Sequence, residues 1–264
     1  MSATRTWKRP PFIKRPLLRW GLAVGAAIFL AISFGTLDIN WGRVAAGLPR
    51  AERFVTSFFP PDFISRADDI YIGIYESLWM TVVSTVIGIG LSIPVGLGAA
   101  RNLSPRPVYL VSRGILAISR TFPEIIIALF AVKLFGFGPF AGIIALSLGT
   151  IGFYGKLLAE DIEDMDQVQA EAVKSTGASW FQWLNYSVQP QVMPRMIGLA
   201  MYRFDINFRE SAVVGIVGGG GIGATLLTSF DRYEYDSAAA ILLVIIGIVM
   251  AVEYSSGFIR KWVQ

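Results

Sequence analysis

Long apolar runs separated by short polar segments are the main feature of this chain. The runs lie near residues 17–37, 75–100, 108–135, 137–156, 196–217 and 237–259. An α-helix rises about 1.5 Å per residue, so each run can cross a hydrocarbon core of about 30 Å. The pattern predicts an all-α, polytopic membrane protein with about six transmembrane helices. The first run exceeds the roughly 7–15 residues of a signal-peptide core, so we expect it to be a retained span.

The polar segments divide the chain into four predicted parts. We expect a basic cytoplasmic N-terminus at 1–16, the first span at 17–37, an extracytoplasmic segment at 38–73, and a membrane-embedded core at 74–260 that carries a polar loop at 156–195. Cytoplasmic segments of membrane proteins are enriched in Lys and Arg. With the N-terminus inside, thirteen of the 23 basic residues fall on cytoplasmic segments and five on outside segments. Both termini are therefore predicted to be cytoplasmic.

Composition argues against an enzyme. The chain is 54% hydrophobic and 16% charged, its mean hydropathy is +0.56, and it contains neither cysteine nor histidine. Thiol nucleophiles and thiolate metal sites are thereby excluded, and the commonest metal ligand and general base is missing. We predict no catalytic residue, metal site or cofactor. The net charge of +4 follows from membrane topology, so the expected partner is lipid rather than nucleic acid.

The polar loop at 156–195 contains two helix-start signals. Asp166 with Gln169 and Ser179 with Gln182 each place a capping residue three positions before a glutamine. The first predicted helix passes Glu171 and stops at Gly177. The second is expected to run from Trp180 to about Val188 and to end at Pro190 and Pro194, before the fifth span.

Two interpretations of this pair of helices are open. In one, the pair docks a partner protein, with small residues allowing close approach and Trp180, Phe181 and Trp183 as apolar anchors. In the other, the loop lies on the membrane with its aromatic residues at the interface. The residues alone do not separate the two.

The spacing of four residues in this loop resembles a known motif. Glu171 and Ala172, then Gly177, then Pro190 are similar to the EAA loop of ABC-importer permeases, although Val173 replaces the second alanine. The resemblance implies a cytoplasmic EAA-type coupling loop that seats in a cleft of a separate ATPase subunit. The positions that it implies for this contact are Glu171, Ala172, Val173, Lys174, Gly177 and Ala178.

The resemblance extends over roughly residues 70–260. Segments 120–124, 209–215 and 218–223 are similar to those of phosphonate-transporter permeases. The resemblance implies a subunit that translocates phosphonate or a related phosphorus oxyanion by alternating access in the inner membrane. It also implies a second permease subunit, two ATPase subunits and an extracytoplasmic substrate-binding protein as partners.

Charged residues fall within the predicted spans, where an unpaired charge costs about 2.5–3.5 kcal/mol; among them are Arg113, Arg120, Lys133, Arg203, Arg209, Glu124, Asp205 and Glu210. Helical spacing predicts that Arg120 pairs with Glu124, that Asp205 pairs with Arg209, and that Arg203, Asn207 and Glu210 share a face. Such residues either line a path for an anion or form interhelical salt bridges. The candidate residues of the path or its gate are Arg113, Arg120, Glu124, Arg203, Asn207, Arg209, Glu210, Gly218, Gly219, Gly220 and Gly221.

Two glycine patterns imitate nucleotide-binding motifs without their context. Residues 218–223 match G-x-G-x-x-G but follow an apolar helix rather than a strand, and residues 149–156 miss the P-loop spacing. We therefore expect ATP to be hydrolysed by a partner. The glycine run predicts either a break in the fifth span at an outer gate or tight helix packing.

Three functions remain open from the sequence. The first is an importer permease for phosphonate or a related oxyanion, and the second is the same type of permease for another small solute such as an amino acid. The third is a passive channel or a structural membrane protein without an ATPase partner. Co-purification of an ATPase would distinguish the first two functions from the third.

Overall fold

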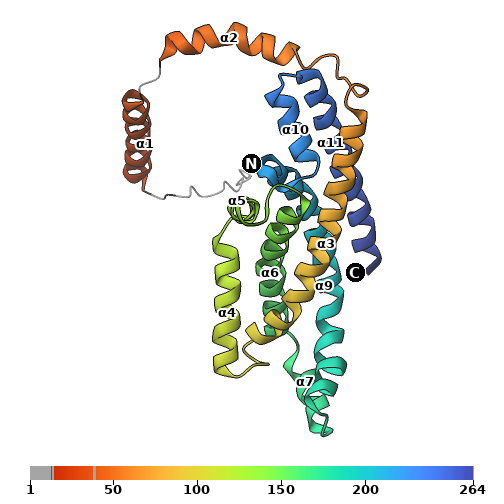
Figure 1. The fold of residues 1–264 in the computed structure, drawn as a ribbon. Coiled ribbons are helices and arrows are strands. Elements are labelled where there is room, and N and C mark those ends of the chain that lie inside the picture. Colours follow the sequence, from red (N-terminus) through yellow and green to blue (C-terminus); the bar gives the residue numbers. More distant parts are fainter. Residues whose placement is uncertain (1–12, 14, 38–39, 264) are drawn as a thin grey trace, which may run out of the picture. The chain divides into compact units, whose positions relative to one another are not determined.

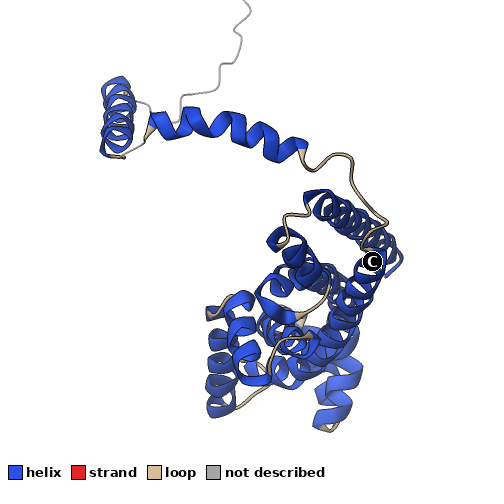
Figure 2. Ribbon diagram, turned by 45° about the horizontal axis from the view of Figure 1, so that its top comes forward, coloured by secondary structure: helices blue, strands red, loops and turns tan. Residues whose placement is uncertain are grey.

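The computed structural model describes residues 13, 15–37 and 40–263, and every regular element of this part is helical (Figure 2). The predicted all-α fold is confirmed. Most of the basic N-terminal segment, including Arg5 and Lys8, lies outside the described residues. The chain divides into two compact units, residues 1–55 and 56–264.

The first unit contributes two helices. α1 (Pro16–Thr36) begins with a proline, whose missing N–H is harmless in the first turn, and contains 21 residues with no buried side chain. It coincides with the predicted first span and is long and apolar enough to cross a membrane. α2 (Trp41–Thr56) has 16 residues and mixed polarity, which does not meet that criterion.

The second unit is a helical bundle (Figure 1). Its helices, in chain order, are α3 (Ala67–Ala99), α4 (Arg106–Thr121), α5 (Glu124–Phe135), α6 (Pro139–Glu163), α7 (Gln167–Ser175), α8 (Trp180–Trp183), the π-helical turn η1 (Leu184–Val188), α9 (Gln189–Val214), the π-helical turn η2 (Gly215–Gly219), α10 (Ile222–Asp231) and α11 (Tyr235–Val263).

Four to six spans fit the described helices. α1, α3, α6 and α11 each pass the length and hydropathy criteria, and two bent pairs pass when each is taken as one span. One pair is α4 with α5, bent by 89°, and the other is Trp180–Gly219 with α10, bent by 54°.

The prediction of one straight helix over 108–135 is wrong. The chain leaves the helix at Phe122, whose φ and ψ of −97° and 124° are extended, and resumes it at Glu124. Pro123 explains the break, because proline disfavours helical geometry in the preceding residue and cannot donate a helical hydrogen bond. Figure 1 accordingly shows α5 end-on beside an upright α4.

Small residues bring α6 close to α3 at the centre of the bundle. A side chain on Gly88 of α3 would collide with Thr150, and one on Gly96 would lie 3.0 Å from the carbonyl oxygen of Gly155. Membrane helices associate through such close backbone packing, because lipid removes the usual hydrophobic driving force. The centre of this bundle therefore depends on glycine, serine and threonine more than on large apolar side chains.

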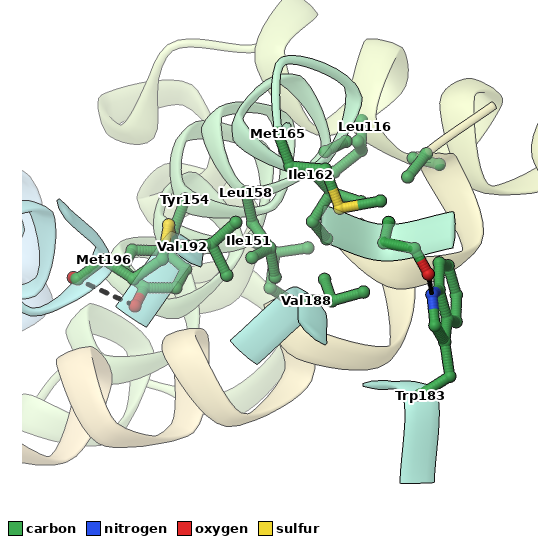
Figure 3. Packing of buried hydrophobic residues seen from close by; sticks show 14 residues of the cluster. Leu116, Ile151, Tyr154, Leu158, Ile162, Met165, Trp183, Val188, Val192 and Met196 are labelled. Carbon is green, nitrogen blue, oxygen red and sulfur yellow. Dashed lines mark hydrogen bonds between the residues drawn. The ribbon is translucent and has the colours of Figure 1, made fainter. Parts of the chain in front are cut away.

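Larger side chains fill the end of the bundle next to α7. Leu116, Ile151, Leu158, Ile162 and Val188 form one buried cluster there, from α4, α6 and η1 (Figure 3). The Tyr154 hydroxyl donates to the carbonyl oxygen of Met196 at 3.1 Å and ties α6 to α9.

The prediction that Pro190 and Pro194 end a helix is also wrong. The helical path continues from Trp180 through both prolines into α9. The π-helical turn Leu184–Val188 precedes Pro190, and the N–H of Gln189 bonds to the carbonyl of Leu184, five residues back. A widened turn of this kind gives a proline ring room that a regular α-helix lacks.

Candidate functional site

A helical hairpin formed by α7, Gly177 and α8 lies between α6 and α9, and we call it the α7–α8 hairpin. Asp166 caps α7 by accepting the N–H of Val168 at 2.9 Å. Ser179 and Gln182 form a reciprocal capping box on α8. Gly177 has a φ of +78°, a conformation that glycine adopts without strain. Both predicted helix starts and the glycine stop are confirmed.

Trp183 closes the α7–α8 hairpin from within. Its side chain is 3% exposed and its indole N–H donates to the carbonyl of Ala170 at 3.0 Å, the bond drawn in Figure 3. The Lys174 ammonium lies 4.1 Å from the centre of the Trp183 ring. The expectation that Trp183 anchors a partner is therefore wrong, because the indole is used in holding the two limbs together.

The outer side of the hairpin carries the residues that are free to meet another molecule. Glu171 and Ala172 are exposed on α7, and Val168 is 76% exposed. On the second limb, Trp180 and Phe181 are exposed and pack edge-to-face with their ring centres 4.9 Å apart. Val173 and the buried Ala170 instead pack toward the bundle.

Polar contacts join the two long helices to each other and the hairpin to one of them. Arg195 of α9 pairs with the buried Asp161 of α6 at 2.8 Å. The N–H of Asp166 donates to Gln191 Oε1 of α9 at 2.8 Å. A displacement of α7 is therefore passed to α9, and through the ion pair of Arg195 with Asp161 to α6.

Arg113, a candidate path residue, belongs to this same end of the bundle. Its guanidinium pairs with Glu163 at 2.8 Å and donates from Nε to the carbonyl of Ala99 at 2.9 Å. It lies over the Tyr109 ring at 5.3 Å. Arg113 therefore joins α4 to the ends of α3 and α6.

A second polar site, the buried charge network, is centred on Arg203 of α9. Its guanidinium is 3% exposed and lies 3.3 Å from Glu124 Oε1 of α5 and 3.2 Å from Glu210 Oε2 of α9. Its Nε donates to Thr150 Oγ1 of α6 at 3.0 Å. A methyl group on Gly149 would lie 2.9 Å from Arg203 Nη2, so glycine leaves the space that the guanidinium occupies.

Asn207 extends the network to α3. Its side-chain amide donates to Thr85 Oγ1 at 2.8 Å and to Thr150 Oγ1 at 3.0 Å. The predicted shared face of Arg203, Asn207 and Glu210 is confirmed by these contacts. Thr85 and Thr150 were missed, although a threonine inside an apolar run is a recognisable hydrogen-bonding partner for helices in lipid.

Of the two other predicted charge pairs, one forms and one does not. Arg209 pairs with Asp205, as predicted. Arg120 does not pair with Glu124, because the break at Pro123 destroys their helical spacing, and Glu124 binds Arg203 instead. Arg120 is exposed and forms no ion pair with any residue that the structure describes.

The glycine run is both a break and a close contact. Gly218, Gly220 and Gly221 have φ values of +97°, +77° and +74°, and a Cβ on Gly220 would lie 2.7 Å from the Pro139 nitrogen. α10 begins at Ile222, whose N–H donates to Ser77 Oγ at 2.9 Å. Gly219 is buried. Glu76 accepts the N–H of Gly221 at 2.9 Å.

Comparison with known proteins identifies related sequences. Residues 92–264 match the family described as "Binding-protein-dependent transport system inner membrane component". The chain is 43% identical over 245 residues to the phosphate-import permease protein PhnE of Mycolicibacterium smegmatis, covering 91% of this chain and 45% of that one. This chain thus spans less than half the length of that relative.

A second relative is matched over nearly its whole length. The putative phosphite transport system permease protein HtxC of Stutzerimonas stutzeri is 37% identical over 253 residues, covering 94% of this chain and 89% of the relative. Among solved structures, an inward-facing MetNI methionine ABC transporter has a TM-score of 0.65 at 23% identity, covering 73% of this chain and 94% of that chain. That structure supports the fold alone.

Proposed function

The chain belongs to the family of binding-protein-dependent transport system inner membrane components, and from this premise we propose that it is the membrane-spanning subunit of an ATP-driven importer of phosphorus oxyanions. It is a multi-pass inner-membrane protein. The proposed substrates are phosphonate, phosphite or phosphate. Transport subunits of this kind move a solute without chemical change, so no catalytic residue is required.

The α7–α8 hairpin is the proposed contact with a separate ATPase subunit, and its geometry is the observation that carries this proposal. Exposed Glu171 and Ala172 offer a docking face, while Trp183 keeps the two limbs together. The continuous helix through Pro190 joins the hairpin directly to α9. Closure of an ATPase dimer would move α7 and rock α9 and α6, giving alternating access to the path.

The charged residues within the bundle differ in how well they are placed to line the translocation path. Arg203 is already bound by two carboxylates, which favours a role in holding α5, α6 and α9 together. Arg120 is exposed and forms no ion pair with a described residue, so it is better placed to attract an oxyanion, for which guanidinium offers paired donors. Arg209 is also exposed, but it already pairs with Asp205. The glycine run at 218–221 is the proposed outer gate, because its two bent helices meet there.

Further partners and the orientation complete the proposal. A second permease subunit, of this chain or a closely related one, would form the other wall of the path. A substrate-binding protein would deliver the solute from outside, with both termini of this chain in the cytoplasm and lipid around its apolar faces.

Purification of the complex tests the ATPase contact. Glu171→Ala removes an exposed side chain of the proposed docking face, and Gln169→Ala is the matched control on the same short helix. We expect the ATPase to be lost or reduced with the first variant and retained with the second. Full retention in both variants would contradict docking at this face.

Amino-acid import is the second candidate, since the probable D-methionine permease MetI of Vibrio cholerae is 24% identical over 206 residues. ATPase activity of the reconstituted complex with its binding protein separates the two candidates. We expect stimulation by phosphonate, phosphite or phosphate. Stimulation by methionine and by none of the oxyanions would favour the second candidate.

A further inference from the structure

α2 has two faces of opposite character. At 100° per residue, Trp41, Val44, Leu48 and Val55 lie within one narrow arc of the helix. All four are exposed, with Trp41 at 71% and Leu48 at 67%. A contiguous exposed apolar face marks a site of interaction with a protein or a membrane.

The opposite face of α2 is basic. Arg43, Arg50 and Arg53 lie around Ala46, which is nearly diametrically opposite Leu48 on the helix. Glu52, the one acidic residue among the sixteen of α2, lies on the apolar side, between Leu48 and Val55 in the chain, and Phe54 lies beside Arg50 on the basic side. Three arginines against one glutamate give the helix a net charge of +2. A positive face beside an apolar one complements a bilayer whose headgroups are anionic.

The chain holds α2 near a membrane surface. α1 is long and apolar enough to span and ends at Thr36, and α2 begins at Trp41. Five Cα–Cα steps separate Thr36 from Trp41 and reach at most about 18 Å when fully extended. The N-terminal end of α2 therefore stays close to the leaflet at which α1 ends, and its first residue is a tryptophan, which favours the membrane–water interface.

We propose that α2 is an interfacial helix that lies along this leaflet, with Trp41, Val44, Leu48 and Val55 in the acyl region and the arginines among anionic lipid headgroups. Helices with this pattern embed about 5–10 Å into the boundary between headgroups and acyl chains. The occupant of the apolar face is thus lipid, and α2 fixes the depth of the segment that links the first span to the bundle. This assignment does not depend on the transported solute.

Spin labelling of the full chain tests the proposal, and the absence of cysteine from the sequence makes single labels straightforward. Leu48→Cys places a nitroxide on the apolar face, and Ala46→Cys is the matched control on the basic face. Each labelled chain is reconstituted in bilayers of phosphatidylcholine with phosphatidylglycerol, and in phosphatidylcholine alone. The collision rate of the nitroxide with oxygen, which partitions into acyl chains, is compared with its collision rate with a water-soluble nickel complex.

The expected result is opposite behaviour of the two labels. The label at residue 48 should collide more with oxygen than with nickel, and the label at 46 more with nickel than with oxygen. This contrast should be larger with phosphatidylglycerol and should fall when Arg43 and Arg50 are both replaced by glutamine. Nickel-dominated collisions at both positions would place α2 in water, and protection of residue 48 from both reagents would mean a protein partner; either result overturns the proposal.

Discussion

Arg203→Gln should strongly destabilise the bundle. The guanidinium contacts Glu124 on α5, Glu210 on α9 and Thr150 on α6, at 3.3, 3.2 and 3.0 Å. Glutamine cannot reach all three partners and carries no charge. Its introduction leaves two carboxylates in a site of low dielectric constant, with no cation between them.

The size of the effect follows from these distances. At an effective dielectric constant of about 20, each pair at 3.2–3.3 Å is worth about 5 kcal/mol of Coulomb energy. Desolvation of the charges offsets much of this gain in the native protein. Breaking a buried pair by removing one partner costs about 3–5 kcal/mol, because the remaining charge is uncompensated. For a chain of this size, that loss lowers Tm by on the order of 10 °C.

Thermal unfolding of the purified chain, followed by tryptophan fluorescence in one detergent, measures this loss. Lys156→Gln is the control, because its pair with Glu160 joins two half-exposed side chains on a single helix. Such pairs contribute about 0.3–0.5 kcal/mol, so this variant should unfold within a degree or two of the parent chain. An Arg203→Gln variant that matched this control would refute the assigned role of the buried charge network.

A triple variant separates a structural role from a path role. Replacing Arg203, Glu124 and Glu210 together by glutamine removes every charge of the pairs and leaves groups that can hydrogen-bond. We expect Tm to recover most of the loss. Recovered uptake as well would assign the network to structure, whereas recovered Tm without uptake would assign it to the path.

Three further outcomes are expected. Gly177→Ala should lower the free energy of unfolding by about 1–2 kcal/mol and weaken ATPase coupling, because the φ of residue 177 is +78° although the space around it is open. The control is Gly114→Ala, which lies in an equally open helical position. It should be neutral or slightly stabilising in the same thermal assay. Trp183→Phe should lose the bond to Ala170 and about 1 kcal/mol, and it should lower transport per ATP hydrolysed in reconstituted complex. Gly223→Ala should abolish folded yield in size-exclusion chromatography, because its Cβ would collide with a backbone carbonyl of α9; normal yield would contradict the packing at this turn.

Local signals made the α7–α8 hairpin predictable. Asp166, Ser179 and Gln182 act within three residues of their own positions, so their caps can be recognised without knowledge of the rest of the fold. Gly177 is similar, because its left-handed conformation is a property of one residue. The helices themselves followed from the apolar runs.

The errors came from interactions that depend on distant partners. The pairing of Arg120 with Glu124 assumed a straight helix, and the break at Pro123 released Glu124 to meet Arg203, 79 residues away. The sequence around Pro190 predicts a helix end, yet a π-helical turn accommodates this proline. The sequence predicts an exposed Trp183, but its burial depends on how the two limbs of the hairpin pack.

Uptake into proteoliposomes tests the central claim most directly. The vesicles would contain this chain with its ATPase, with ATP enclosed and the binding protein and a radiolabelled solute outside. We expect accumulation of phosphonate, phosphite or phosphate that requires ATP and the binding protein and is lost with Glu171→Ala. Accumulation that continues without ATP, or none of any of the three oxyanions, would contradict it.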